Sequence, residues 1–195
     1  CQRCNACISE SFVPYVKYPS RVLRCTANPT FFREIMTDNL KPAAEHKRVL
    51  VAGGGPAGMQ AAITLADRGH EVILCEKTDS LGGALKFARH ISFKQNLDKL
   101  MNVLIRRVHS RAIEVMLNTE ATPELAKHLN VDCVIAAIGG EPIIPPIPGV
   151  DGKNVVLAIG LHDHMDDVGD SVVIVGGGLV GCEEGLHLAQ MGKKV

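Results

Sequence analysis

The chain has 195 residues, of which 46% are hydrophobic, so it is long enough to form one or two domains with an apolar core. Its 21 basic residues balance its 21 acidic residues, which argues against nucleic acid or an anionic membrane surface as a partner. We find no apolar run of membrane-spanning length and no signal-peptide pattern at the amino end, and therefore expect a soluble cytoplasmic protein with no membrane contact.

Four cysteines cluster in residues 1–45, a segment with little hydrophobic periodicity that an apolar core alone would not order. Cys1, Cys4 and Cys7 lie within seven residues, and Cys25 follows 18 positions later. Thiolates at this spacing suit a polynuclear iron-sulfur centre, whereas a zinc site more often uses two separated C-x-x-C pairs. We expect these four cysteines to bind a [4Fe-4S] cluster, with zinc and disulfides as the alternatives.

From Lys47 onward, short apolar runs alternate with helical periodicity. Residues 48–53 form an apolar run that ends in glycine, as expected for a parallel strand buried on both faces. Residues 56–69 carry apolar side chains at helical spacing, and 70–77 form the next apolar run. Together these segments predict a strand-helix-strand unit of the kind that binds nucleotides.

The later segments continue this alternation and predict an α/β protein with a Rossmann-like fold of the two-dinucleotide-domain type. We expect an amphipathic helix at 92–110, strands at 113–119 and 132–139, a short helix at 122–129, a proline-rich connector at 139–149, and a second strand, turn and helix in 171–195. The corresponding domains are an iron-sulfur segment at 1–45, an FAD domain at 46–150, and the start of a nested NAD(P)H domain at 151–195.

Two turns match the pattern G-x-G-x-x-G, each directly after a predicted strand and at the start of a predicted helix. Such a turn brings backbone N–H groups against a pyrophosphate, where a Cβ atom would collide, and the helix amino end adds partial positive charge. The alternative is that the glycines serve close packing alone. The glycines are Gly53, Gly55 and Gly58 in the first turn and Gly176, Gly178 and Gly181 in the second.

An acidic residue at the end of the second strand is expected to hold the ribose hydroxyls of the bound nucleotide. Glu76 lies 23 residues after Gly53 and fits this role. For the second turn the corresponding residue would lie beyond Val195, so the sequence does not distinguish NADH from NADPH.

The sequence RVLVAGGGPAGMQAAITLADRGHEVILCEKTDSLGGAL (48–85) resembles the FAD-binding opening of two-dinucleotide-domain flavoprotein reductases. In that family an LGG segment, here Leu81 to Gly83, lies along the flavin cofactor. The stretch AAIGGEP resembles the A-T-G strand end of the same family, with Ile138 in place of the threonine. The resemblance implies FAD contacts from Pro56, Ala57, Lys77, Gly82, Gly83, Ala137 and Gly139.

Residues 171–195 are similar to the nested NAD(P)H-binding module of these reductases, including an early helical acid, Glu183 or Glu184. The cysteine segment followed by the FAD fingerprint is similar to the iron-sulfur flavoproteins of the old yellow enzyme class. That class carries FMN and the substrate site in an upstream TIM barrel, so we expect this chain to be a piece of a longer protein. Other partners that the class allows are a small-molecule substrate and a second copy of the chain.

The resemblance implies an electron relay from NAD(P)H through FAD and the [4Fe-4S] cluster to FMN, which would reduce an activated C=C bond. No side chain of this chain is then expected to act as a catalytic acid or base. One alternative is an ADP-binding structural module of an amine-dehydrogenase-like enzyme, whose cluster passes electrons to an external flavoprotein. Another is the electron-input part of a glutamate-synthase-like or pyrimidine-reducing enzyme.

Several other polar residues are expected to have structural roles. Cys75, Cys133 and Cys182 lie singly in apolar or glycine-rich segments and should be buried thiols. His162 and His164 are expected at a solvated helix end rather than at a metal. Arg106 and Arg107 are expected on a solvated helix face.

Overall fold

The computed structural model describes residues 25–35 and 40–195, which form two compact units. The first unit contains the described residues up to Lys86 together with Asn96–Gly139, and the second contains Phe87–Gln95 and Gly140–Val195. Three of the predicted cluster ligands, Cys1, Cys4 and Cys7, lie outside the described residues. Among the described residues, no helix has the length and apolar character needed to cross a membrane.

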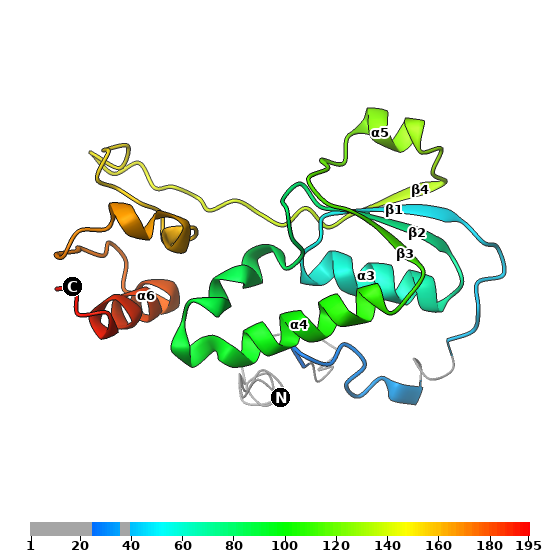
Figure 1. The fold of residues 1–195 in the computed structure, drawn as a ribbon, viewed down its shortest axis with the longest axis horizontal. Helices are drawn as coiled ribbons and strands as arrows, with labels where there is room; N and C mark the ends of the chain where they lie inside the picture. Colours follow the sequence, from blue (N-terminus) through cyan, green and yellow to red (C-terminus); the bar gives the residue numbers. More distant parts are fainter. Residues whose placement is uncertain (1–24, 36–39) are drawn as a thin grey trace, which may run out of the picture. The chain divides into compact units, whose positions relative to one another are not determined.

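The first unit is built on a four-stranded parallel sheet with the strand order β3-β2-β1-β4 (Figure 1). Helix α3 (Pro56–Asp67) makes the crossover between the first two strands. This arrangement confirms the α/β prediction. The strands are β1 (Arg48–Ala52), β2 (Glu71–Cys75), β3 (Ile113–Met116) and β4 (Cys133–Ala136).

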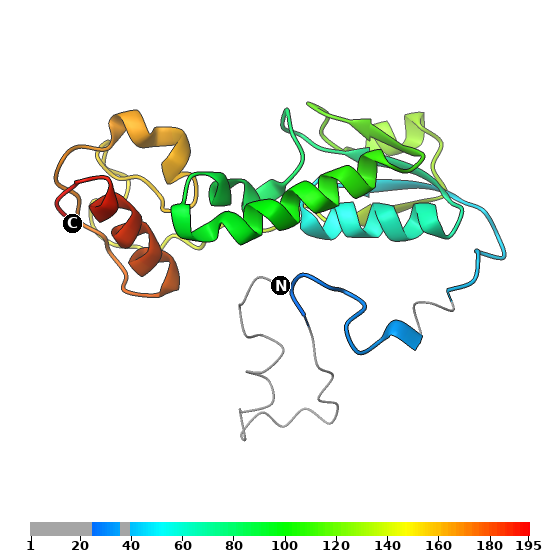
Figure 2. The same cartoon turned by 60° about the horizontal axis from the view of Figure 1, so that its bottom comes forward.

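Helices cover both faces of this sheet. Helices α3 and α4 (Gln95–His109) lie side by side on one face, and α5 (Pro123–His128) lies on the other, as Figures 1 and 2 show. The larger core lies under α3 and α4, and the smaller one lies under α5. Burial of these apolar side chains is the main force that holds the layers together. The buried residues are Val51, Met59, Ala62, Ile63, Val72, Leu74, Leu81, Leu104 and Val108 on the first face and Leu50, Ile73 and Cys75 on the second.

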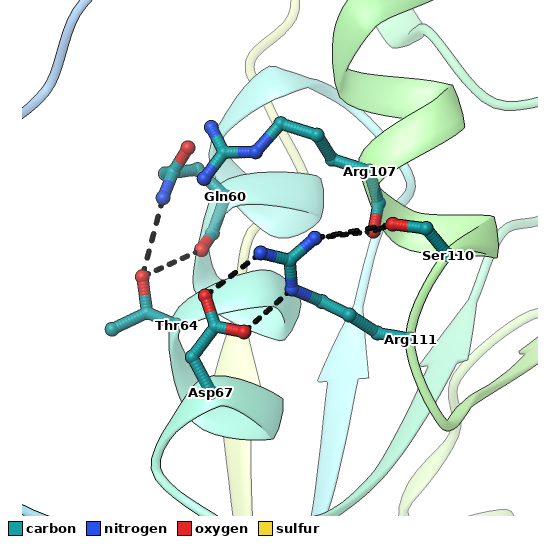
Figure 3. A network of polar contacts seen from close by, with 6 residues as sticks. All are labelled: Gln60, Thr64, Asp67, Arg107, Ser110 and Arg111. Atoms are coloured by element: carbon teal, nitrogen blue, oxygen red, sulfur yellow. Dashed lines mark hydrogen bonds and ion pairs between the residues drawn. The ribbon is translucent and has the colours of Figure 1, made fainter.

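An ion pair joins the end of α3 to the turn that follows α4 (Figure 3). The guanidinium of Arg111 donates to both carboxylate oxygens of Asp67, over 2.6 Å from Nε and 3.0 Å from Nη2. It also donates from Nη1 to the carbonyl oxygen of Arg107, at 2.9 Å. The contact with Asp67 raises the pKa of Arg111. The contacts fix the two helices against each other at the edge of the larger core.

The second unit contains helix α6 (Leu179–Gln190), 3₁₀ helices at Ser92–Lys94 and Leu161–Asp167, and extended connections. The strand that the sequence predicts directly before the second glycine turn is absent from this unit. Val173 and Val175 are largely exposed, and this stretch takes part in one isolated bridge, between Ser171 and Lys194. A strand requires a hydrogen-bonded neighbour, and within the described residues only Lys194 supplies one.

The three single cysteines differ in burial. Cys75 is buried in the smaller core, as predicted, and burial is the main cause that raises the pKa of its thiol. The prediction is wrong for Cys133 and Cys182, which are exposed. Cys133 begins β4, the last strand of the sheet on one side, and Cys182 lies in the first turn of α6. At these two positions the surrounding sequence segment is apolar or glycine-rich, but the cysteine side chain is exposed.

Candidate nucleotide sites

The first glycine turn connects β1 to α3, and at two of its glycines the protein leaves no room for a side chain. Gly53 has φ of 107°, and a Cβ atom there would lie 2.4 Å from the carbonyl oxygen of Ala137. A Cβ atom at Gly58 would lie 1.8 Å from the carbonyl oxygen of Gly53. Both positions therefore need glycine for the fold itself.

Gly55 is different, because the protein leaves room for a side chain there. A Cβ atom at Gly55 would meet only the Cα atom of Gly83, at 3.9 Å, and its φ of −74° suits any residue. Gly55 is also the N-cap of α3, no side chain caps this end, and its first turn holds no acidic residue. The uncapped N–H groups and the open space beside them fit the pyrophosphate of a dinucleotide.

Glu76 lies at the end of β2 beside this turn and is 7% exposed. One carboxylate oxygen accepts from the backbone N–H of Gly54 at 2.8 Å, and the other accepts from the backbone N–H of Thr78 at 2.9 Å. Burial alone would raise the pKa of Glu76. The hydrogen bonds from Thr78 and Gly54 and the charge of Lys86 outweigh burial, so the pKa is lowered and the carboxylate is ionised at neutral pH.

The LGG segment approaches the same turn. The backbone N–H of Gly82 donates to the carbonyl oxygen of Gly54 over 3.0 Å, and the side chain of Leu81 is buried beneath it. Gly83 has φ of 53°, and a Cβ atom there would lie 2.8 Å from the Cα atom of Gly55. The two glycine segments thus lie in contact.

The remaining predicted contacts differ in how closely they approach the turn. The backbone N–H of Ala137 donates to the carbonyl oxygen of Ala52 at 2.8 Å, which places this strand end against Gly53. Gly139 has φ of 78° and no heavy atom within 4 Å of a hypothetical Cβ, and the neighbouring Ile138 is 80% exposed. Pro56 and Ala57 form the first turn of α3, whereas the side chain of Lys77 is exposed.

The second glycine turn has nearly the same backbone as the first. Gly178, the N-cap of α6, has φ of −75° and ψ of −177°, compared with −74° and −179° at Gly55. Gly176 has φ of 115°, and a Cβ atom at Gly181 would lie 1.9 Å from the carbonyl oxygen of Gly176. No side chain caps this helix either. The turn therefore offers a second set of uncapped N–H groups for an anion.

Both candidate acids of α6 have partners within the second unit. Glu183 pairs with the ammonium group of Lys94, and both side chains are mostly buried. Glu184 is buried against His162, whose Nε2 atom lies 3.6 Å from the Glu184 carboxylate.

The prediction that the histidines of Leu161–Asp167 lie at a solvated helix end is wrong for His162. Its side chain is 5% exposed and lies between two further imidazoles, with His90 stacked at 5.0 Å between ring centroids and His187 at 5.2 Å. Burial lowers the pKa of His162, the nearby Glu184 raises it, and the net shift is downward. His164, by contrast, is more than half exposed.

The predicted metal ligands remain a prediction. Cys25 is the only one of the four in the described part of the chain, and its side chain is half-buried. Within residues 25–35 and 40–195, no group of three or more His, Cys, Asp or Glu residues is arranged to hold a metal ion.

A parallel sheet whose strand ends carry a glycine turn, a helix amino end and a buried acid defines a dinucleotide-binding α/β domain. Residues 47–195 match the model of the family described as pyridine nucleotide-disulphide oxidoreductase. The chain belongs to this family, which confirms the prediction of an oxidoreductase domain and indicates FAD and NAD(P)H as its cofactors.

Several named relatives are similar over most of the chain. An NADH oxidase of Thermoanaerobacter brockii is 42% identical over 180 residues, which cover 89% of this chain and 27% of that protein. A cinnamate reductase of Clostridium sporogenes is 39% identical over 171 residues, which cover 88% of this chain and 25% of that protein. The solved structure of a 2-naphthoyl-CoA reductase complex superposes with a TM-score of 0.82 at 33% identity, covering 88% and 26%.

These similarities confirm the predicted relationship to the flavoprotein reductases. The chain spans about a quarter of the length of the relatives described above.

Sequence reasoning missed two residues near the first turn, Thr78 and Lys86. Both are polar residues near the LGG segment, but neither belongs to a recognisable pattern. Their position beside Glu76 comes from the segment after β2, which folds back so that Gly82 bonds to Gly54. It also missed the burial of His162 and Glu184, because their contact joins segments about 20 residues apart.

Proposed function

We propose that this chain is the electron-input part of a larger NAD(P)H-dependent iron-sulfur flavoprotein reductase. In this proposal FAD binds at the first glycine turn and NAD(P)H at the second. Cys1, Cys4, Cys7 and Cys25 would hold a [4Fe-4S] cluster, and bound FAD would supply the exchange between two-electron hydride transfer from NAD(P)H and one-electron transfer to that cluster. The domain boundaries are those expected from the sequence, at 1–45, 46–150 and 151–195.

The observation that carries this proposal is the pairing of Gly55 with Glu76. Gly55 leaves open space in front of uncapped N–H groups, and Glu76 offers an ionised carboxylate at the end of the next strand. A pyrophosphate and a ribose of one nucleotide would use these two features together. The chain's own residues would bind and orient the cofactor, and none of them is required to move a proton.

Our proposal for the reaction of the whole protein is supported by the names of the relatives. Those named cinnamate reductase and 2-naphthoyl-CoA reductase act, by their names, on conjugated acids or thioesters. We infer that the cluster would supply electrons to FMN in an upstream TIM barrel, where an enoate or enoyl thioester would be reduced at its C=C bond.

A second candidate is an ADP-binding structural module of an amine-dehydrogenase-like enzyme. Its support is the similarity to a histamine dehydrogenase structure, with a TM-score of 0.59 at 26% identity over 65% of this chain. The second glycine turn favours the reductase, because its backbone matches that of the first turn and offers the same uncapped helix end.

The test is to purify the chain without oxygen and to measure its cofactors. We expect bound FAD together with iron and acid-labile sulfide. Bound ADP with no affinity for FAD would support the structural module instead. Zinc without iron would contradict the proposed cluster.

A further inference from the structure

Lys86 lies in the 3₁₀ helix Gly83–Arg89, which begins at the last glycine of the LGG segment. A Cβ atom built at Gly82 would lie 3.2 Å from Cγ of Lys86 and 2.5 Å from the sulfur of Met101. The aliphatic part of Lys86 therefore packs over Gly82. This packing directs the ammonium group back toward the end of β2.

The ammonium group reaches Glu76 through one intermediate side chain. Nζ of Lys86 donates to Oγ1 of Thr78 at 2.8 Å, and Oγ1 of Thr78 lies 2.9 Å from a carboxylate oxygen of Glu76. Because the hydroxyl oxygen accepts from Lys86, its own proton is available to the carboxylate. The carbonyl oxygen of Ser80, at 3.1 Å, is the other acceptor for this proton.

We propose that Lys86 is a positioning residue of the first nucleotide site, which acts through Thr78 to hold the Glu76 carboxylate ionised and in place beside Gly54. This inference rests on the proposed function, because the ligand it serves is the dinucleotide bound at the first turn. An ionised carboxylate only accepts hydrogen bonds, so it recognises ribose hydroxyls as donors and repels a ribose 2′-phosphate. Lys86 thereby favours a nucleotide with free ribose hydroxyls, such as FAD.

The electrostatics agree with this geometry. Burial of Glu76 raises the pKa of its carboxyl group, and the hydrogen bonds of Thr78 and Gly54 lower it, as does the charge of Lys86. If the ammonium group is removed, burial has less opposition and the pKa of Glu76 must rise. The carboxylate would then become protonated at a higher pH than in the unaltered chain.

The experiment compares FAD binding to the chain and three variants by titration calorimetry between pH 7.5 and 4.5. Lys86→Met removes the charge but keeps an unbranched side chain that can cover Gly82. Lys86→Arg keeps the charge. Lys99→Met removes an exposed lysine from the same unit and serves as the matched control.

We expect Lys86→Met to weaken FAD binding about threefold at pH 7.5, the scale of one partly exposed charge contact. As the pH is lowered, we expect Lys86→Met to lose its affinity for FAD at a higher pH than the unaltered chain does. Lys86→Arg should restore most of the affinity, and Lys99→Met should have no effect. A Lys86→Met profile that superimposes on that of the unaltered chain would overturn the inference.

A second measurement separates this inference from the proposed function. The carboxyl carbon of Glu76 can be titrated by NMR in the FAD-free chain, with and without Lys86→Met. A higher Glu76 pKa in the variant supports the role of Lys86, and an unchanged value overturns it. If the unaltered chain binds no FAD at any pH, the proposed function is wrong, whereas the NMR titration still decides whether Lys86 acts on Glu76.

Discussion

Gly55 and Gly58 are both glycines of the first turn, but they differ in what a side chain would meet. At Gly58 a Cβ atom would overlap the carbonyl oxygen of Gly53, whereas at Gly55 the nearest atom is 3.9 Å away. Packing therefore accounts for Gly58 within the protein itself. The protein sets no such steric requirement at Gly55, as we expect if the proposed pyrophosphate approaches the backbone there.

Substitution by alanine should separate these two requirements. We expect Gly55→Ala to fold normally, because its φ and its surroundings accept a Cβ atom, and to weaken FAD binding about tenfold or more. Gly58→Ala should lower the free energy of unfolding by about 3 kcal/mol, since the overlap forces the turn apart. Thermal unfolding measures the stability of both variants, and FAD titration measures their affinity. Equal FAD affinity for Gly55→Ala and the unaltered chain would argue against a pyrophosphate at this turn.

At the scale of elements, the ion pair of Asp67 and Arg111 stabilises the contact between α3 and the turn after α4 (Figure 3). The two side chains are 50% and 24% exposed, so solvent screens the pair. We expect Arg111→Ala to lower the free energy of unfolding by about 1 kcal/mol, including the lost bond to the carbonyl of Arg107.

Arg106→Ala is the matched control, because its side chain lies exposed on α4. Urea denaturation of the two variants measures the difference between them. An equal decrease in the free energy of unfolding of both variants would mean that the bidentate ion pair does not stabilise the fold.

The imidazole cluster of the second unit should make stability depend on pH. Because burial lowers the pKa of His162 in the folded chain, the unfolded chain binds its proton more tightly. The stability that neutral His162 provides is complete above its ordinary pKa of about 6.5 and is lost as the pH falls through the lower, folded value. The groups that face His162 are Glu184 and His187 of α6 and His90 of the 87–95 segment.

His162→Gln removes this titration and should flatten the decline in thermal stability between pH 7 and pH 5. His164→Gln, at an exposed position in the same 3₁₀ helix, should leave the decline unchanged. A decline that is the same in both variants would assign the pH dependence to other groups.

The elements that could be predicted from the sequence are those whose signals are local. Strand β1, helix α3 and strand β2 lie where apolar runs and helical spacing place them, and Thr122 caps α5 where the short helix was expected. The run 171–175 has the same local signal as β1 but has no neighbouring strand to pair with in the described chain, apart from one bridge to Lys194. Strand formation depends on such partners, and sequence periodicity does not supply them.

The candidate site shows the same division. The structure brings the first glycine turn and Glu76 together, as their spacing in the sequence predicted, and their binding of a dinucleotide stays a prediction. Lys86 and His162 each lie in a 3₁₀ helix, and they contact Thr78 and Glu184 respectively. Many sequences would allow such contacts, and no fixed spacing marks them.

On the scale of the whole molecule, the core of the first unit contains no side chain from the described parts of the cysteine segment, residues 25–35 and 40–45. The core of the first unit is made mainly by side chains of the sheet and of helices α3, α4 and α5, together with Leu81 of the LGG segment, all from residues 48–136. Phe32 and Ile35, in the described residues closest to Cys25, are largely exposed. Loss of the proposed cluster should therefore leave the nucleotide sites folded.

Cys4→Ser tests this separation. We expect it to abolish iron and sulfide binding, because a cluster held by three of four thiolates is labile, while FAD affinity and the unfolding transition of the sheet are retained. Cys133→Ser removes an exposed thiol from β4 and should keep the full iron content. The measurements are iron and sulfide analysis, FAD titration and thermal unfolding of both variants. Unchanged iron in Cys4→Ser would remove the case for a cysteine-bound cluster, and a loss of FAD binding together with iron would show that the two sites depend on each other.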